Sequence, residues 1–374
     1  MKEDITYVGL DVHKNSIQVA MLMTETGELV EWKETVNGRG YARLIKRLKK
    51  KAGGELMVCY EAGPCGYTLQ RQLNKAQVAC RVIAPSLIPI KPGQRIKTNR
   101  RDARKLVLYL SKGDLLQEVV PPTPEQEALR ELSRCRAAKK EDVSRARHQL
   151  SKFLLRNGLA YRSGRSWTKG HWRWLKGVDL EDRLLQQVFE HYLVGVEREE
   201  EELKAVEQEL RYWAEQEPYR EAVGWVRCFR GFDTISAVVV VSELYSFGRF
   251  QTAKGLMNFL GLTPSENSSG DELKRGRITK AGNGRVRSIL VEAAWHYRHR
   301  PAVGARLRQR RKGQPAPVIG IADKAMRRLY RRYHRLVMRG KDTRKIVVAI
   351  ARELVGFLWD VLSRPYRQQQ GMAV

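Results

Sequence analysis

The sequence predicts an α/β domain at the N-terminus, a helical coiled-coil connector and a mostly α-helical C-terminal region. Three observations lead to this fold class. Residues 1–122 alternate strand-like and helix-like patterns, residues 123–215 lack strand patterns and are rich in helix formers, and residues 216–374 are helical apart from one insertion rich in Gly and Ser. A chain of 374 residues is also long enough for two or three cores. We therefore expect domain boundaries near residues 122 and 215.

The N-terminal region begins with three strand-like segments joined by tight turns, and then alternates helices and strands. The predicted strands cover residues 7–12, 16–23, 28–36, 56–60 and 79–84. The predicted helices cover residues 40–51, a segment from about 66, and 101–111, the last after a basic loop. This order is the one that a mixed five-stranded sheet with covering helices would produce.

The connector carries apolar residues at spacings of three and four from Leu185 to Trp213, which predicts a helical hairpin or coiled coil. Its apolar seam predicts a homo-oligomer, a dimer or a tetramer. The acidic run at 197–202 is expected to be a solvated helix face. Three tryptophans lie among cations between the helices, and we favour an aromatic joint over a contact with nucleic acid: Trp167, Trp172 and Trp174.

Lysine and arginine outnumber aspartate and glutamate by 70 to 41, for a formal net charge of +29. Such a field attracts polyanions, so nucleic acid is the expected partner, although a ribosome-associated or peripheral membrane protein could carry the same charge. Residues 301–345 are the most one-sided, with fifteen Lys or Arg against two Asp. The N-terminal residues lack the apolar run of a signal peptide, and the aliphatic stretch 235–241 is too short to span a bilayer. A cytoplasmic protein without a membrane partner is expected.

Three acidic residues stand at the ends of predicted elements in the N-terminal domain. Asp11 ends the first strand, Glu61 follows the fourth, and Asp102 begins the last helix, with Asn99 three residues before it. If the first and fourth strands are adjacent and parallel, Asp11 and Glu61 lie side by side. Each acid alone is an ordinary structural choice, and Asp in a first helical turn is a common cap. Together they supply the hard oxygen ligands that a two-Mg²⁺ phosphoryl-transfer site needs.

The segments GLDVHK, YEAGPCGY and KTNRRDARKL resemble the motifs of the DEDD transposases of the IS110 group of insertion sequences, the bridge-RNA-guided recombinases. The segment from RGFDTISAVVVVSEL to GNGRVRSILVEAAW is similar to that group's C-terminal transposase domain, so the resemblance covers essentially the whole chain. It implies an RNase H-like (RuvC-like) catalytic domain that binds one or two Mg²⁺ ions through Asp11, Glu61, Asn99 and Asp102. Asn99 stands where the family usually has Asp, and its neutral amide predicts weaker metal binding.

The C-terminal region contains a loop rich in Ser and Gly, LTPSENSSGDELKRGRITKAGNGR. The resemblance marks Ser269, before Gly270, as the nucleophile on a DNA phosphate, with Ser268 as the fallback. Upstream, residues 229–243 resemble a helix-hairpin-helix element around Gly231. Cations before Asp102 and around the serine loop are expected to hold phosphates. They are Lys97, Arg100, Arg101, Lys274, Arg275, Arg277, Lys280, Arg285 and Arg287.

Three functional hypotheses follow from these features. The first is a transposase that cuts and rejoins the DNA of element ends and target, with Mg²⁺, a covalent step at Ser269 and, as the resemblance implies, a structured guide RNA that reads sequence by base pairing. The second is a hydrolytic junction nuclease resembling RuvC, which needs no serine nucleophile. The third is a nucleic-acid-binding protein in which Asn99 has abolished catalysis.

Overall fold

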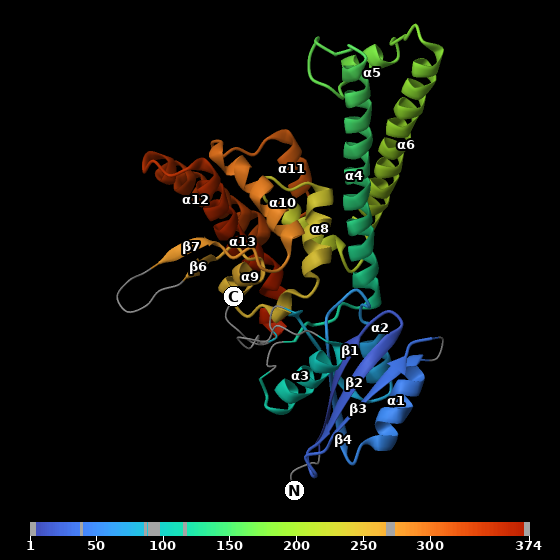
Figure 1. Ribbon diagram of the computed structural model, residues 1–374. Coiled ribbons are helices and arrows are strands. Elements are labelled where there is room, and N and C mark those ends of the chain that lie inside the picture. Colours follow the sequence, from blue (N-terminus) through green and yellow to red (C-terminus); the bar gives the residue numbers. More distant parts are fainter. Residues whose placement is uncertain are drawn as a thin grey trace. The chain divides into compact units, whose positions relative to one another are not determined.

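The computed structural model describes residues 5–37, 40–85, 88, 98–114, 118–266 and 274–369, with the backbone alone for residues 275 and 366–369. The chain divides into two compact units, Met1–Pro121 and Pro122–Val374 (Figure 1). None of the helices in the described ranges combines the length and the apolar character that a bilayer crossing needs.

The first unit is built on a mixed five-stranded sheet, which confirms the prediction from the order of elements. The strand order is β3-β2-β1-β4-β5. β1, β2 and β3 form an antiparallel meander, whereas β4 and β5 add to β1 in parallel. The strands are β1 (Ile5–Val12), β2 (Ser16–Met23), β3 (Leu29–Thr35), β4 (Glu55–Glu61) and β5 (Ala79–Ile83).

Helices cover both faces of this sheet. α1 (Gly40–Lys51) and α2 (Thr68–Lys75) bury leucines against one face, where they pack on Val8, Leu10 and Val58. α3 (Asn99–Ser111) covers the other face and begins two residues earlier than the sequence predicts. Its N-cap is Thr98, whose hydroxyl accepts a hydrogen bond from the amide of Arg101 at 3.3 Å.

α3 lies very close to the backbone of β1. A Cβ atom on Gly9 would come within 2.3 Å of the carbonyl oxygen of Ala103 and 2.6 Å of the amide nitrogen of Val107. Earlier in β1, Tyr7 packs beside Leu106, which lies further along α3. The helix therefore runs against the direction of β1, and its first turn lies toward the C-terminal edge of the strand.

The second unit begins with a helical hairpin. α4 (Pro124–Arg156) and α6 (Arg183–Ala214) lie lengthwise against each other, and short α5 (Lys169–Leu175) lies between them in the chain (Figure 1). Trp167, Trp172 and Trp174 pack against a core that includes residues of both long helices. The tryptophan segment is therefore an aromatic joint, as we expected.

The acidic run at 197–202 differs from the expectation of a merely solvated face. Glu199 and Glu202 both lie within ion-pair distance of Lys139 on α4, at 3.6 and 3.1 Å. Glu200 accepts from Arg147 of the same helix at 2.6 Å. The run therefore helps to set how α6 packs on α4, through partners more than fifty residues away in the sequence.

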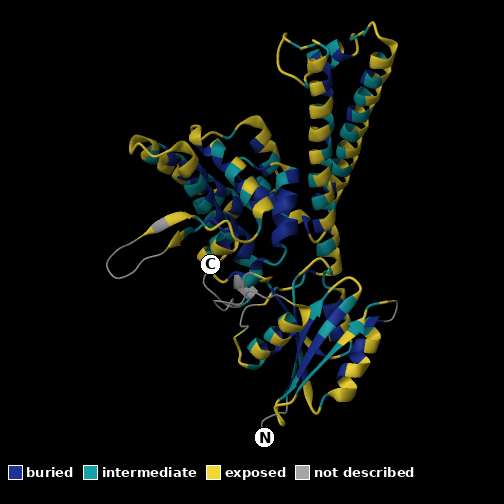
Figure 2. Ribbon diagram, in the orientation of Figure 1, coloured by how far each residue is buried: buried dark blue, intermediate teal, exposed yellow. Residues whose placement is uncertain are grey.

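The rest of the second unit is mostly helical, and its helix α8 (Thr234–Leu244) is buried almost throughout its length (Figure 2). A two-stranded sheet, which the sequence analysis did not predict, interrupts the helices. The elements are α7 (Arg220–Arg227), α8 (Thr234–Leu244), η2 (Phe247–Arg249), α9 (Ala253–Phe259), β6 (Pro264–Glu266), β7 (Arg275–Ile278), α10 (Gly284–Trp295), η3 (His296–Arg298), α11 (Ala305–Arg311), α12 (Ala316–Met338) and α13 (Thr343–Gln369).

Replacing Gly9 with alanine is expected to destabilise the first unit, because the new methyl group would collide with the backbone of α3. The expected loss is about 3 kcal/mol, measured as faster hydrogen exchange of the β1 and β4 amides in the full chain. The matched control is Gly195→Ala in α6, where no atom lies within 4 Å of the added Cβ. This control should instead stabilise its helix by about 0.5–1 kcal/mol. Unchanged exchange in Gly9→Ala would contradict the close helix–strand contact.

Candidate active site and nucleic-acid interface

Asp11 and Glu61 lie at the same edge of the sheet. β1 and β4 are adjacent and parallel, as the hypothesis of a shared site required, with Leu10 opposite Tyr60. Asp11 and Glu61 are the next residues of the two strands. Leu10 and Tyr60 point into the core beneath α1 and α2. Since side chains alternate along a strand, Asp11 and Glu61 belong to the opposite face, which α3 covers.

The first turn of α3 brings two more oxygen-bearing residues toward this edge. Asn99 is the first residue of the helix, and Asp102 lies three positions later, so both are near the same side of the helix entry. Because α3 runs against β1, this turn lies toward the strand end that carries Asp11. The strand pairing thus places Asp11 beside Glu61, and the helix turn that carries Asn99 and Asp102 lies toward the same end of the sheet.

The donor chemistry of these residues suits Mg²⁺. This ion takes hard oxygen ligands and is usually held by one or two carboxylates together with waters and substrate phosphates. Within the described ranges, no three His, Cys, Asp or Glu side chains are grouped closely enough to hold a metal ion. Oδ2 of Asp11 lies 3.0 Å from Nε2 of His13. Asp11, Glu61 and Asp102 therefore do not form a three-acid group in this structure. A metal at this edge would depend on the strand-end carboxylates and on phosphate oxygens of a bound nucleic acid.

Glu31 of β3 anchors the start of α3. Its carboxylate accepts hydrogen bonds from Nε of Arg100 at 2.8 Å and from Nη2 of Arg104 at 2.8 Å. Burial raises the pKa of Glu31, but the hydrogen bonds and positive charges of the two arginines outweigh it and lower the pKa below its usual value. Arg100, which the sequence predicts to hold phosphate, therefore has an internal role in positioning the helix that carries Asn99 and Asp102.

The candidate nucleophiles Ser268 and Ser269 lie outside the described residues, between β6 and β7. These two strands pair antiparallel, with Pro264 opposite Ile278, so the two ends of the serine segment are adjacent. The base of this strand pair is closely packed. Cβ atoms on Gly261 and Gly282 would fall within 2.3 Å of backbone oxygens, and both glycines have positive φ angles.

Arg287 also holds the base of the strand pair. Its Nη1 atom donates to the carbonyl oxygen of Leu260 at 2.9 Å and to that of Ala281 at 3.1 Å. Leu260 precedes β6 and Ala281 follows β7, so one guanidinium joins the segments that enter and leave the serine loop. The sequence predicts phosphate binding for Arg287, whereas its contacts within the chain are structural.

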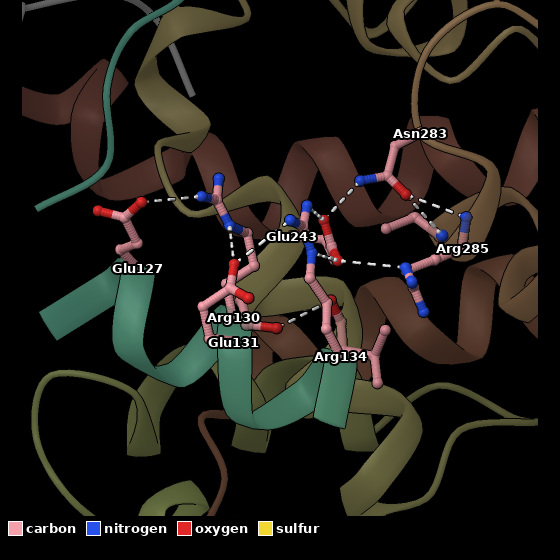
Figure 3. Close-up of polar contacts among 10 residues, drawn as sticks. Glu127, Arg130, Glu131, Arg134, Glu243, Asn283 and Arg285 are labelled. Atoms are coloured by element: carbon pink, nitrogen blue, oxygen red, sulfur yellow. Dashed lines mark hydrogen bonds and ion pairs between the residues drawn. The ribbon is translucent and has the colours of Figure 1, made fainter. Parts of the chain in front are cut away.

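Glu243, which is buried at the end of α8, is the centre of a polar network (Figure 3). Its carboxylate accepts from Arg134 of α4 at 2.9 and 3.1 Å and from Nδ2 of Asn283 at 2.8 Å. Nε of Arg285 lies 3.9 Å away. Burial raises the pKa of Glu243, but hydrogen bonds from Arg134 and Asn283 and the nearby positive charge lower it overall. Sequence reasoning missed Glu243, since a lone acid in the apolar segment TISAVVVVSEL carries no periodic signal.

Asn283 links Glu243 to the start of α10. As the N-cap residue, its Oδ1 atom accepts hydrogen bonds from the amides of Arg285 and Val286, each at 3.1 Å. The same side chain donates to Glu243 through its other end. The carboxylate thereby fixes the point at which the chain leaves the serine segment and enters α10.

Most of the other cations that the sequence predicts to hold phosphate are exposed, and the side chains of two lie outside the described residues. The exposed ones within the described ranges are Arg101, Lys274, Arg277 and Lys280, and Arg285 is exposed on one side of the Glu243 network. Lys97 and the side chain of Arg275 lie outside the description. In the helix-hairpin-helix-like element, Phe229 belongs to the turn and not to a helix. Gly231 has a φ of 90°, and an added Cβ would lie 2.7 Å from Cα of Ala293, so close packing against α10 requires this glycine.

The sequence matches models of two transposase families. Residues 8–157 match the DEDD transposase model of the IS110 type, and residues 226–308 match the transposase IS116/IS110/IS902 family. The first match contains Asp11, Glu61 and Asp102, and the second contains Glu243 and the serine segment. The two matches therefore define a transposase.

Similarity to individual transposases extends over nearly the full length. The chain is 40% identical over 365 residues to a putative transposase, y4qE, of Sinorhizobium fredii, an alignment that covers 97% of this chain and 89% of that protein. It is 35% identical to the transposase for insertion sequence element IS1533 of Leptospira borgpetersenii, over 91% of this chain and 99% of that protein. The chain belongs to the IS110 family of DEDD transposases.

Substituting Glu31 with glutamine is expected to loosen the first turn of α3, because Arg100 and Arg104 lose their shared counter-charge. Hydrogen exchange of the α3 amides should accelerate roughly tenfold, the equivalent of one charge-assisted hydrogen bond. Glu34→Gln on the same strand is the matched control, since Glu34 pairs with Arg43 and Arg47 of α1. The control should leave α3 unchanged, and equal effects from both substitutions would contradict a specific anchor.

Substituting Glu243 with glutamine is expected to destabilise the second unit by roughly 2–3 kcal/mol, because Arg134 loses its charged partner and one of its two acceptor oxygens. Its pKa in the folded protein is below the ordinary value of 4.5. The stabilisation is therefore fully present above that value and is lost as the pH falls through the lower folded-state pKa.

The difference in free energy of unfolding between wild type and Glu243→Gln should consequently be largest at neutral pH and decrease in acid. Urea unfolding followed by tryptophan fluorescence measures it, since every tryptophan but Trp32 lies in the second unit. Glu209→Gln, an exposed position on α6, is the control and should change little. A difference that is constant with pH would show that Glu243 does not act as a carboxylate.

Proposed function

We propose that this transposase cuts and rejoins DNA strands by Mg²⁺-dependent phosphoryl transfer, with Asp11, Glu61 and Asp102 as metal ligands and Asn99 as a supporting ligand. The observation that carries the proposal is the parallel pairing of β1 and β4, which places Asp11 beside Glu61 at one sheet edge. The first turn of α3 adds Asn99 and Asp102 on the same face. This arrangement supports assignment of the first unit to the RNase H-like, RuvC-like class of catalytic domains.

The proposed covalent step uses Ser269 of the second unit. Its hydroxyl oxygen attacks a phosphorus atom of the DNA backbone, the bond from phosphorus to a deoxyribose oxygen breaks, and the departing oxygen takes up a proton as that of serine is lost. The resulting phosphoserine ester retains a phosphate ester bond, so a deoxyribose hydroxyl can later attack it, restore a phosphodiester and release the serine. Bound Mg²⁺ would supply the positive charge that stabilises the attacking and leaving oxygens.

The same proposal includes a structured guide RNA and a homo-oligomer. A guide RNA would read sequence by base pairing, while the protein, with its net charge of +29, binds backbones. Self-association as a dimer or a tetramer is supported by large apolar side chains that the α4–α6 hairpin exposes. These are Leu155, Leu184, Leu185, Val194, Tyr212 and Trp213.

Strand cleavage and covalent adduct formation by the purified protein test this function directly. The reaction contains Mg²⁺, DNA of the element ends and the RNA encoded by the element, and compares wild type with Ser269→Ala and Asp11→Ala. We expect a protein–DNA adduct in wild type and none in either variant. Ser268→Ala is the matched control and should retain the adduct.

The other outcomes separate the competing functions. Cleavage that survives Ser269→Ala would identify a hydrolytic nuclease of the RuvC kind. A silent wild type that gains cleavage on Asn99→Asp would identify a nucleic-acid-binding protein whose metal site has lost a charge. Either result would reject the serine mechanism.

A further inference from the structure

The outer face of α12 carries a row of cations that face away from the protein core. The helix buries six residues on one side, among them Ala322, Leu329 and Tyr333. Four exposed residues occupy the opposite side at spacings of three and four, and we name them the α12 stripe: Lys324, Arg327, Arg331 and Arg335. This spacing gives each cation a separation of about 4.5–6 Å along the helix axis.

Two other arginines of α12 are neutralised by a carboxylate within the protein. Arg328 and Arg332 both pair with Glu353 of α13, the latter at 2.8 Å. By contrast, no carboxylate of the described residues lies within ion-pair distance of any member of the α12 stripe. Nε of Arg331 donates a hydrogen bond to the carbonyl oxygen of Arg327, one turn earlier in the same helix, at 3.4 Å. The protein thus neutralises one edge of the helix and leaves the stripe with its full charge.

Aromatic groups flank the stripe on its other edge. The rings of Tyr330 and His334 lie 4.4 Å apart between their centroids. Nε2 of His334 lies 3.0 Å from the carbonyl oxygen of Arg298, which joins the end of η3, another cationic segment, to α12. The helix that carries the stripe is therefore held by contacts on both of its edges, so its backbone presents the four cations on one outer face.

We propose that the α12 stripe binds the phosphodiester backbone of duplex DNA without reading sequence. Duplex DNA carries one negative charge per roughly 1.7 Å of axis, a density that can neutralise all four cations at once. Neighbouring unpaired cations repel one another, and a phosphate backbone removes this repulsion while releasing condensed counterions. The inference rests on the DNA binding in the proposed function but is independent of the strand chemistry at Asp11 and Ser269.

Salt-dependent binding of the full-length protein to a short DNA duplex of unrelated sequence tests the inference. The stripe variant combines Arg327→Gln, Arg331→Gln and Arg335→Gln. Each lost phosphate contact lowers the slope of log affinity against log salt by about 0.9, so the slope should fall by about 2.7. Between about 50 and 200 mM salt, wild type should therefore lose roughly 40-fold more affinity than the stripe variant.

The control variant removes the same charge from arginines that already have partners. Arg198, Arg211 and Arg220 are exposed and pair with Glu199, Glu207 and Glu217. Their combined substitution by glutamine should leave the slope near the wild-type value. A wild-type slope in the stripe variant, or an equal fall in the control, would overturn the proposal.

Two further measurements are needed. One distinguishes duplex DNA from RNA as the partner, and the other distinguishes failure of this inference from failure of the proposed function. An unrelated RNA hairpin serves as a second probe, and a loss confined to this RNA would reject duplex DNA as the ligand. The second measurement is the adduct assay on wild type. If the salt slope depends on the stripe while wild type makes no adduct, the DNA-binding surface stands and the serine mechanism fails.

Discussion

The candidate active site depends on the direct contact between the backbone of β1 and the backbone of α3 at Gly9. Any side chain at this position would push the helix away from the sheet, because the carbonyl oxygen of Ala103 leaves no room even for a Cβ atom. With the helix seated on the strand, its first turn lies toward the edge that carries Asp11 and Glu61. A packing constraint in the middle of the domain thus determines where the polar residues at its edge can meet.

Each unit anchors a helix with a carboxylate that arginine neutralises, half-buried at Glu31 and buried at Glu243. Glu31 holds Arg100 and Arg104 and orients α3, and Glu243 holds Arg134 and orients Asn283. In each case burial alone would favour the protonated acid, and the arginines reverse the shift. A buried charge kept in this way is costly to leave unpaired, so each network specifies one arrangement of its helices.

The large positive charge of the chain is divided by the fold into two populations. Some arginines have internal partners, either carboxylates, as for Arg328, or backbone carbonyls, as for Arg287. Others, as in the α12 stripe, keep their charge on an exposed helix face. Net charge therefore predicts attraction to nucleic acid, but only the tertiary structure shows which of these cations have carboxylate or carbonyl partners within the protein.

Sequence alone determined the strand and helix order of the first unit, the helical hairpin and the positions of Asp11, Glu61, Asn99 and Asp102 at element ends. These features follow from local periodicity and turn chemistry, which a short window of residues contains. The β6–β7 pair was not predicted because its strands are three and four residues long, too short to show an alternation of apolar and polar residues. The roles of Arg100, Arg287 and Glu243 could not be predicted from the sequence, because each depends on a partner that lies far away along the chain. Tertiary structure alone decided them, since hydrogen bonds and ion pairs act over a few ångströms in space and not along the chain.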